Sequence, residues 1–235
     1  MTLNILAIDT SDGPGSVAAA KGNGLLKQVG LGRAQRTAQS LVPKLGALLA
    51  DIGWQPAEVR LVAVSVGPGS FTGLRIGLTT AKTFAYAVGA EILGVDTLEA
   101  IAAAAPAELD QLAVAVDAQR GEVVAQVFRR ADDRWMRAAG PRRRVAIEPW
   151  LDSLPDGAAV SLPWPHRSTD RAAARIALVE PRWREELAGA VAALAWRDHQ
   201  AGRRDDPWSL LPVYSRRAAA EEKWEARRAA PPAAP

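Results

Sequence analysis

The sequence predicts an α/β protein built from two related halves, and three observations support this. Within residues 1–105, apolar segments of strand length alternate with segments whose apolar residues follow helical spacing. Each half opens with a short apolar strand that ends in an aspartate, Asp9 or Asp117. The composition also changes, since seven of the eight Trp but only five of the nineteen Gly lie in residues 118–235. These features indicate a duplicated ribonuclease-H-like fold of the actin-like (ASKHA) type, with two subdomains of which the second is degenerate.

The first half is expected to contain three strands, a helix, and then a strand, helix, strand and helix. Leu41, Leu45, Leu48 and Ile52 are spaced by four, three and four residues, which is typical of one face of a helix. Glycine or proline follows each predicted helix and ends it. The expected strands cover residues 3–8, 15–20, 25–31, 61–66 and 92–95, and the expected helices cover residues 38–52, 73–88 and 98–105.

The second half repeats the opening hairpin and then diverges. Strands are expected at 112–116, 123–128, near 143–147 and at 176–179, with helices at 150–154 and 183–200. We therefore predict an N-terminal actin-like subdomain (1–105) and a smaller divergent subdomain (106–205). A C-terminal segment (206–228) is predicted to pack back on the chain, before a disordered tail (229–235).

Composition excludes several classes of site. Apolar residues make up 49% of the 235-residue chain and charged residues 23%, so the chain can form a packed core. It has no Cys, which excludes disulfides, thiolate zinc sites and a Cys nucleophile. His166 and His199 are its only two His and are too far apart in sequence for a paired-His metal motif. Without a long apolar run, we expect a cytoplasmic protein with no membrane contact.

The net charge of +3 conceals an asymmetry between the halves. Residues 1–117 carry 8 basic and 10 acidic residues, whereas residues 118–235 carry 21 basic and 16 acidic residues. Basic residues mixed with Trp are typical of nucleic-acid contact. However, 24 of the 29 basic residues are Arg, which is also typical of a genome-wide compositional bias. Both interpretations remain open, and we expect weak, salt-dependent binding of tRNA at most.

The string GPGSFTGLRIG at residues 67–77 lies between an expected strand and an expected helix. Backbone amides at the start of a helix can bind an anion, so this loop is a candidate phosphate site. It fits neither the P-loop nor the GxGxxG pattern. A tight turn whose glycines let the helix approach its neighbours is the alternative. The candidate motif loop consists of Gly67, Pro68, Gly69, Ser70, Phe71, Thr72 and Gly73.

A second candidate is a vestigial phosphate site formed by Asp9, Thr10, Ser11 and Asp117. A carboxylate at the end of a strand can hold hydrated Mg²⁺ against phosphates. The alternatives are an Asx-type turn after Asp9 and a simple hairpin turn after Asp117. An actin-type site also needs a late glycine-rich loop for adenosine, and only isolated glycines follow Gly121. The nucleotide site is therefore predicted to be degenerate, with no catalytic residue and no metal ligand.

The motif loop resembles that of the bacterial tRNA threonylcarbamoyladenosine biosynthesis (TsaB) family. Residues 5–11 (ILAIDTS), 94–98 (GVDTL) and 117–123 (DAQRGEV) are also similar to segments of this family. Near the C-terminus, Pro212, Val213, Tyr214 and Arg216 resemble its final segment. The resemblance covers residues 1–125 well and residues 205–225 loosely. TsaB proteins are inactive paralogues of TsaD in the actin-like ATPase and glycoprotease-like group.

The resemblance implies a non-catalytic scaffold subunit. The chain would pair with a catalytic TsaD-like subunit and, with a TsaE-like ATPase, support synthesis of N6-threonylcarbamoyladenosine at position 37 of tRNAs that read ANN codons. ATP and Mg²⁺ would be used by the partners, tRNA would be met mainly through the complex, and the chain alone would form a homodimer. Two other functions remain open from the residues, a degenerate small-molecule kinase and an inactive glycoprotease-like protein.

The helix expected at 73–88 predicts the partner surface. Its apolar arc is roughly 200° wide, whereas packing on one sheet needs only about 100°. We therefore expect part of this arc, together with the helix at 38–52, to contact another chain. The alternative is that the two helices pack on each other and on the sheet. The predicted interface residues are Leu41, Leu45, Leu48, Leu74, Gly77, Leu78, Ala81 and Ala85.

Overall fold

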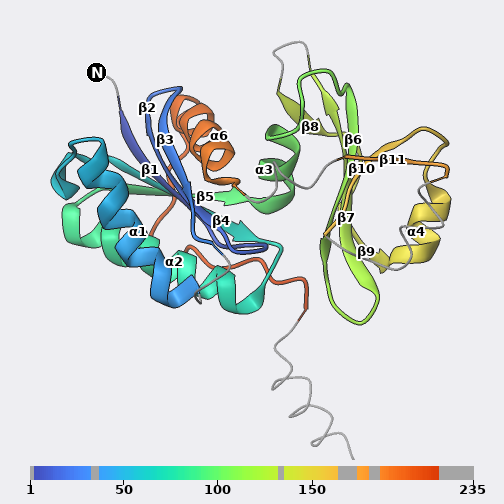
Figure 1. The fold of residues 1–235 in the computed structure, drawn as a ribbon, viewed down its shortest axis with the longest axis horizontal. Coiled ribbons are helices and arrows are strands. Elements are labelled where there is room, and N and C mark those ends of the chain that lie inside the picture. The colour runs from blue at the N-terminus through green and yellow to red at the C-terminus, as the bar shows by residue number, and fades with distance from the viewer. Residues whose placement is uncertain (1–2, 33–36, 132–134, 164–173, 180–185, 217–235) are drawn as a thin grey trace, which may run out of the picture.

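The computed structural model describes residues 3–32, 37–131, 135–163, 174–179 and 186–216 (Figure 1). It contains two lobes, each built on one β-sheet, with α3 between them. The predicted disordered tail (229–235) and residues 217–228 of the predicted C-terminal segment lie outside the described residues. The expected α/β class and the division into two sheets are confirmed.

The first lobe has a five-stranded sheet with the order β3-β2-β1-β4-β5. Its first three strands form an antiparallel meander, and β1, β4 and β5 run parallel. The alternating apolar residues of β1 and β4 are buried on both faces, as parallel central strands require. The elements of this lobe are β1 (Asn4–Asp9), β2 (Ser16–Lys21), β3 (Gly24–Gly30), α1 (Thr37–Asp51), η1 (Pro56–Glu58), β4 (Leu61–Gly67), α2 (Phe71–Val88), β5 (Glu91–Asp96) and α3 (Thr97–Ala103).

Helices cover both faces of this sheet (Figure 1). Leu6, Ile8 and Val64 face α1 and α2, in a cluster that also contains Leu48 and Leu78. The other face packs against α6 (Ala188–Gln200), whose small apolar stripe includes Val191 and Ala195. The prediction from the sequence that this helix belongs to the second subdomain is wrong. Its alanine-rich face fits the alanine-rich back of β1, β2 and β4, so it packs on the first sheet instead.

The second lobe has a six-stranded sheet with the order β11-β10-β6-β7-β8, and β9 also pairs with β7. Helix α4 covers one face, and α3 packs on the other. Strands β8 and β10 are absent from the sequence prediction, because three-residue strands carry no readable period. The elements are β6 (Gln111–Asp117), β7 (Glu122–Arg130), β8 (Met136–Ala138), β9 (Arg143–Ala146), α4 (Ile147–Ser153), β10 (Ala159–Ser161) and β11 (Ala177–Leu178).

After α6 the chain returns across the molecule as a segment that we call the strap, residues 203–216. It pairs with the free edge of β5 through an isolated bridge between Ile92 and Asp205. Further along, the Val213 amide donates to the carbonyl of Val66 at 2.6 Å. The strap then reaches the second lobe, where Arg216 contacts Glu122. The described residues of the predicted C-terminal segment thus contact both lobes.

Candidate functional site

The motif loop connects β4 to α2 and lies against the turn that follows β1. Ser70 caps α2, because its hydroxyl accepts a hydrogen bond from the Gly73 amide at 3.2 Å. The Ser70 amide donates to the carbonyl of Ser11 at 2.7 Å. The Thr10 hydroxyl donates to the carbonyl of Gly73, also at 2.7 Å. The start of the helix is therefore bonded to residues 10 and 11 of the same chain.

Three glycines make this close packing possible. A Cβ atom on Gly69, Gly73 or Gly77 would lie less than 3.0 Å from an oxygen atom of Thr10 or Ser11, a separation that real Cβ atoms do not show. The space that an anion would need at the helix start is thus filled by the β1–β2 turn. Of the two interpretations of this loop, the structure favours the tight turn over the phosphate cradle.

Asp9 lies at the end of β1 and is fully buried. Its Oδ1 accepts hydrogen bonds from the amide and the hydroxyl of Ser11, at 3.2 and 2.6 Å. Among the described residues, its buried Oδ2 has no hydrogen-bond partner, and neither has the buried hydroxyl of Ser65. Burial raises the pKa of the Asp9 carboxyl above its ordinary value, and the hydrogen bonds from Ser11 offset only part of this effect. An Asx-type turn describes this arrangement.

Asp117 occupies the corresponding end of β6 but has a different environment. It is exposed, and its Oδ1 accepts a hydrogen bond from the Gln119 amide at 2.7 Å. Gln119 and Arg120 both have positive φ angles, as a tight hairpin turn between β6 and β7 requires. Among the described residues, Asp9 and Asp117 share no hydrogen bond. The local turns at Asp9 and Asp117 match the alternatives given for them, and a vestigial phosphate site formed by Asp9, Thr10, Ser11 and Asp117 stays a prediction.

The strap adds an aromatic contact to the motif loop. The Tyr214 and Phe71 rings lie 4.6 Å apart. The Arg75 guanidinium lies 4.0 Å from the centre of the Phe71 ring, and its Nε donates to the Tyr214 hydroxyl at 2.9 Å. This cluster joins the first turns of α2 to the strap. The sequence links Tyr214 to the family only by resemblance. It does not indicate the role of Arg75, because no local pattern connects Arg75 with a residue as distant in the chain as Tyr214.

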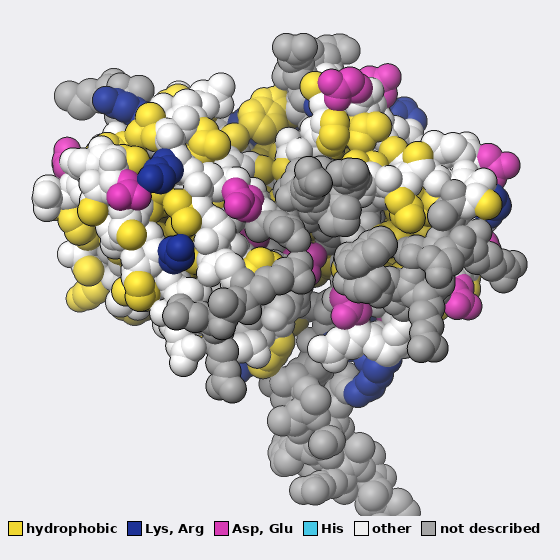
Figure 2. All heavy atoms as spheres, viewed as in Figure 1, with side chains coloured by type: hydrophobic (Ala, Val, Ile, Leu, Met, Phe, Trp, Pro, Cys, Tyr) yellow, Lys and Arg dark blue, Asp and Glu magenta, His cyan; other side chains and the backbone are white. Residues whose placement is uncertain are grey.

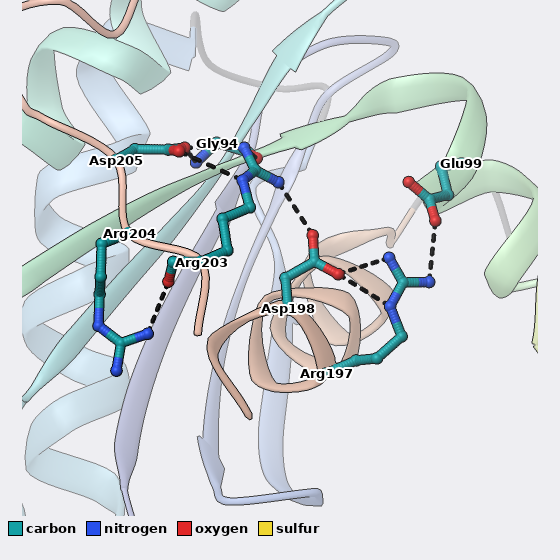
Figure 3. A network of polar contacts seen from close by, with 7 residues as sticks. All are labelled: Gly94, Glu99, Arg197, Asp198, Arg203, Arg204 and Asp205. Carbon is teal, nitrogen blue, oxygen red and sulfur yellow. Dashed lines mark hydrogen bonds and ion pairs between the residues drawn. The ribbon is translucent and has the colours of Figure 1, made fainter. Parts of the chain in front are cut away.

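A polar network fixes the start of the strap to both α6 and β5 (Figure 3). Arg197 pairs with Glu99 of α3 at 2.9 Å and with Asp198 at 2.6 Å. Asp198 in turn pairs with Arg203, whose guanidinium donates to the carbonyl of Gly94 at 2.8 Å.

The amide of Gly94 donates to the Asp205 carboxylate at 2.8 Å. Side chains of the strap thus satisfy both backbone groups of Gly94 at the outer edge of β5. An open edge of this kind would otherwise be available for pairing with another chain.

The eight predicted interface residues are all buried within the first lobe. Leu41, Leu45 and Leu48 of α1 have exposed fractions of 4% or less, and so do Leu74 and Leu78 of α2. The same holds for the alanines, while Gly77 packs against Thr10. The assignment of this apolar arc to a partner surface is therefore wrong. The arc is wide because α2 packs on the sheet with one side and on α1 with another.

In the described part of the chain, His, Asp and Glu side chains do not gather in any group of three that could hold a metal ion. Within the same ranges, none of the helices has the length and apolarity needed to cross a membrane.

Comparisons with known proteins agree on one group of related proteins. Residues 33–155 match the model of TsaD, tRNA N6-adenosine threonylcarbamoyltransferase. An uncharacterized protein of Mycobacterium tuberculosis, Rv3421c, is 35% identical over 78% of this chain and 77% of its own length. The TsaB protein of Bacillus subtilis is 29% identical over 65% of this chain and 66% of its own length. The TsaB protein of Escherichia coli is 31% identical over 56% of this chain and 57% of its own length.

Solved structures agree with these sequence relatives. YeaZ from Pseudomonas aeruginosa matches with a TM-score of 0.72 and 27% identity, over 90% of this chain and 99% of that one. A second structure from this organism, described as an uncharacterized protein with similarity to peptidase YEAZ, matches with a TM-score of 0.73 at 26% identity. It covers 91% of this chain and 100% of the other. The actin-like two-lobe architecture predicted from the sequence is confirmed, and the chain belongs to the TsaB family within the wider group that the TsaD model describes.

Proposed function

We propose that this chain is a non-catalytic subunit in the synthesis of N6-threonylcarbamoyladenosine at position 37 of tRNAs that read ANN codons. The relatives are named for threonylcarbamoyladenosine biosynthesis, and the matching family model is that of the transferase. The observation that carries the non-catalytic role is the filled motif loop. Thr10 and Ser11 occupy the helix start where a nucleotide phosphate would need to bind.

In this proposal the chain acts in the cytoplasm without a cofactor of its own. ATP and Mg²⁺ are used by a TsaD-like transferase subunit and a TsaE-like ATPase, and tRNA is met mainly through the complex. Titration calorimetry of the chain with MgATP tests the first point. We expect no tight binding, and a dissociation constant below about 10 μM, or roughly −7 kcal/mol, would contradict it.

The surface proposed for the TsaD-like partner is the outer face of α1 and α2, in place of the buried arc. On α1 the exposed residues are mostly small or apolar, with Gln39 and Lys44 among the exceptions, and Val42 has an exposed fraction of 62%. On α2 it is made mainly of exposed threonines. Figure 2 shows mostly apolar and uncharged side chains over these two helices. The face consists of Ala38, Val42, Pro43, Gly46, Ala47, Ala50, Thr72, Thr79 and Thr83.

A helix pair whose exposed residues are mostly small suits close packing against a second helix pair, which would complete a four-helix bundle. With the TsaD-like subunit absent, the same face would form a homodimer. Val42→Asp introduces a charge at an exposed position of this face without entering the core. We expect Val42→Asp to abolish co-elution with the partner, and the matched control Ala107→Asp, in an exposed loop, to leave it unchanged. Both variants should keep the wild-type circular dichroism spectrum.

The cellular test is depletion of the chain followed by mass spectrometry of tRNA nucleosides. We expect the threonylcarbamoyladenosine content to fall and the wild-type chain to restore it. An unchanged content would contradict the proposed function. Full rescue by Val42→Asp would contradict the proposed surface but not the function, so the two claims can fail separately.

A further inference from the structure

The second lobe separates its charges in space. Residues 122–146, which span β7, β8 and β9, carry seven Arg and three acidic residues, Glu122, Asp132 and Asp133. The rest of this part of the sequence (106–121 and 147–179) carries four Arg and seven acidic residues. A genome-wide bias toward Arg would raise the Arg content of both parts. It does not account for one strongly basic edge on a lobe that is acidic elsewhere.

Strand alternation divides these arginines between two faces. Arg142 and Arg144 lie on the face that meets the first lobe. Arg142 pairs with Asp96 of β5, and Arg144 lies 3.6 Å from the Glu122 carboxylate of β7. Arg143 lies between them in sequence and is paired in register with Ala125, whose side chain belongs to the cluster under α4. Arg143 therefore points to the outer face of the sheet, away from both acidic partners.

Arg129 and Arg137 lie on this same outer face, directly opposite each other in the β7–β8 register. All three outward arginines are exposed. Arg129 donates to the neutral Gln111 side chain, and no carboxylate in the described part of the chain lies within ion-pair distance of Arg129 or Arg143. Charged side chains on an exposed edge also protect it from pairing with another chain, so edge protection is the alternative role of these arginines.

The spacing of this face suits a polyanion. Ala125 and Arg129 are four residues apart on β7, so Arg143 and Arg129 are separated by about 13 Å along the strand. Guanidinium groups bind phosphate oxygens with paired hydrogen bonds, and Arg is favoured for this contact. We propose that Arg129, Arg137 and Arg143 form an RNA-backbone contact surface on the outer face of β7, β8 and β9. This rests on the proposed function, which supplies tRNA as the RNA, and the surface would orient tRNA without reading its bases.

The test measures tRNA binding by the full chain in complex with its transferase subunit, between 50 and 200 mM KCl. Removal of two phosphate contacts in Arg129→Gln/Arg143→Gln should lower the slope of log K against log[salt] by about 1.8. The affinity of the wild-type complex should therefore fall about tenfold more across this range than that of the variant. The matched control is Arg60→Gln/Arg175→Gln, which removes the same charge from exposed positions elsewhere. Arg129→Lys/Arg143→Lys should keep most of the binding.

Three outcomes would overturn the proposal. One is an equal loss of slope in the control, which would indicate a general effect of net charge. Another is an unchanged slope in Arg129→Gln/Arg143→Gln. The third is normal tRNA binding with loss of the transferase subunit from that variant, which would assign the surface to an acidic protein. A failure of the proposed function would appear separately, as an unchanged threonylcarbamoyladenosine content after depletion of the wild-type chain.

Discussion

The packing of α2 on the β1–β2 turn predicts a large effect of one methyl group at Gly73. In Gly73→Ala the new Cβ would lie less than 3.0 Å from the carbonyl oxygen of Thr10, 3.2 Å from its carbonyl carbon and 3.3 Å from the Ser70 Cβ. The nearest atoms belong to backbone, so no side-chain rotation relieves the overlap. Either α2 or the turn must move, and the Thr10 hydrogen bond to the Gly73 carbonyl is lost with it.

The expected size follows from opposing effects. Overpacking costs about 1–3 kcal/mol and the lost hydrogen bond about 1 kcal/mol, while Ala in place of Gly returns up to about 1 kcal/mol of helix propensity. The net destabilisation is therefore about 1–3 kcal/mol. For a chain of this size, that lowers the melting temperature by about 2–12 °C in calorimetry.

Gly46→Ala is the matched control, because Gly46 lies in α1 with nothing within 4 Å of the new Cβ. This variant should melt about 2–4 °C above the wild type. A second check uses Gly77, whose Cβ would meet the Thr10 hydroxyl. Thr10→Ala removes that hydroxyl, so Gly77→Ala/Thr10→Ala should cost less than the sum of the single changes. A Gly73→Ala protein that melts within 2 °C of the wild type would refute the close-packing argument.

Two other predictions concern Asp9 and the strap. Because burial raises the folded-state pKa of Asp9, the folded chain binds more protons than the unfolded chain, and stability falls as pH rises from about 3.8 through the raised value. Asp9→Asn should remove this dependence and gain about 1–3 kcal/mol at pH 8 in urea unfolding; a less stable variant there would contradict the assignment. Asp205→Ala should cost about 1–3 kcal/mol and speed amide exchange at Gly94, whereas Asp156→Ala, at an exposed pair, should change stability by less than 1 kcal/mol. Equal exchange at Gly94 in both variants would show that the Asp205 side chain does not protect the β5 edge.

The sequence predicts the first lobe well because its signals are local. Strands such as β1 and β4 are short apolar runs, and α1 carries a clear row of leucines that ends near Gly53. The location of α6 required long-range information. Its stripe of Val191 and alanines is compatible with either sheet, and the choice depends on the small residues that it meets on the first sheet.

The candidate site was only partly predictable, because it too depends on contacts between residues far apart in the sequence. Gly69, Gly73 and Gly77 indicate close approach from the sequence alone, but an anion and a protein backbone require the same open space. Only the position of Thr10 decides between them. The prediction of the partner surface was wrong because a helical wheel counts apolar residues without showing how many neighbouring elements bury them.

Helix α2 has two such neighbours, the sheet and α1, so most of an apolar arc twice the usual width is buried inside the lobe, with Ile76 and Phe84 partly buried at its margins. The face left for another chain is then the one that looks polar on the wheel, where Thr79 and Thr83 are exposed. Threonine methyl groups and small α1 residues can still pack closely at such a face, since a non-obligate interface is about as apolar as the remaining surface. A wide apolar arc therefore indicates a helix that is buried on several sides. Which face docks another chain depends on which small residues remain exposed after the lobe has folded.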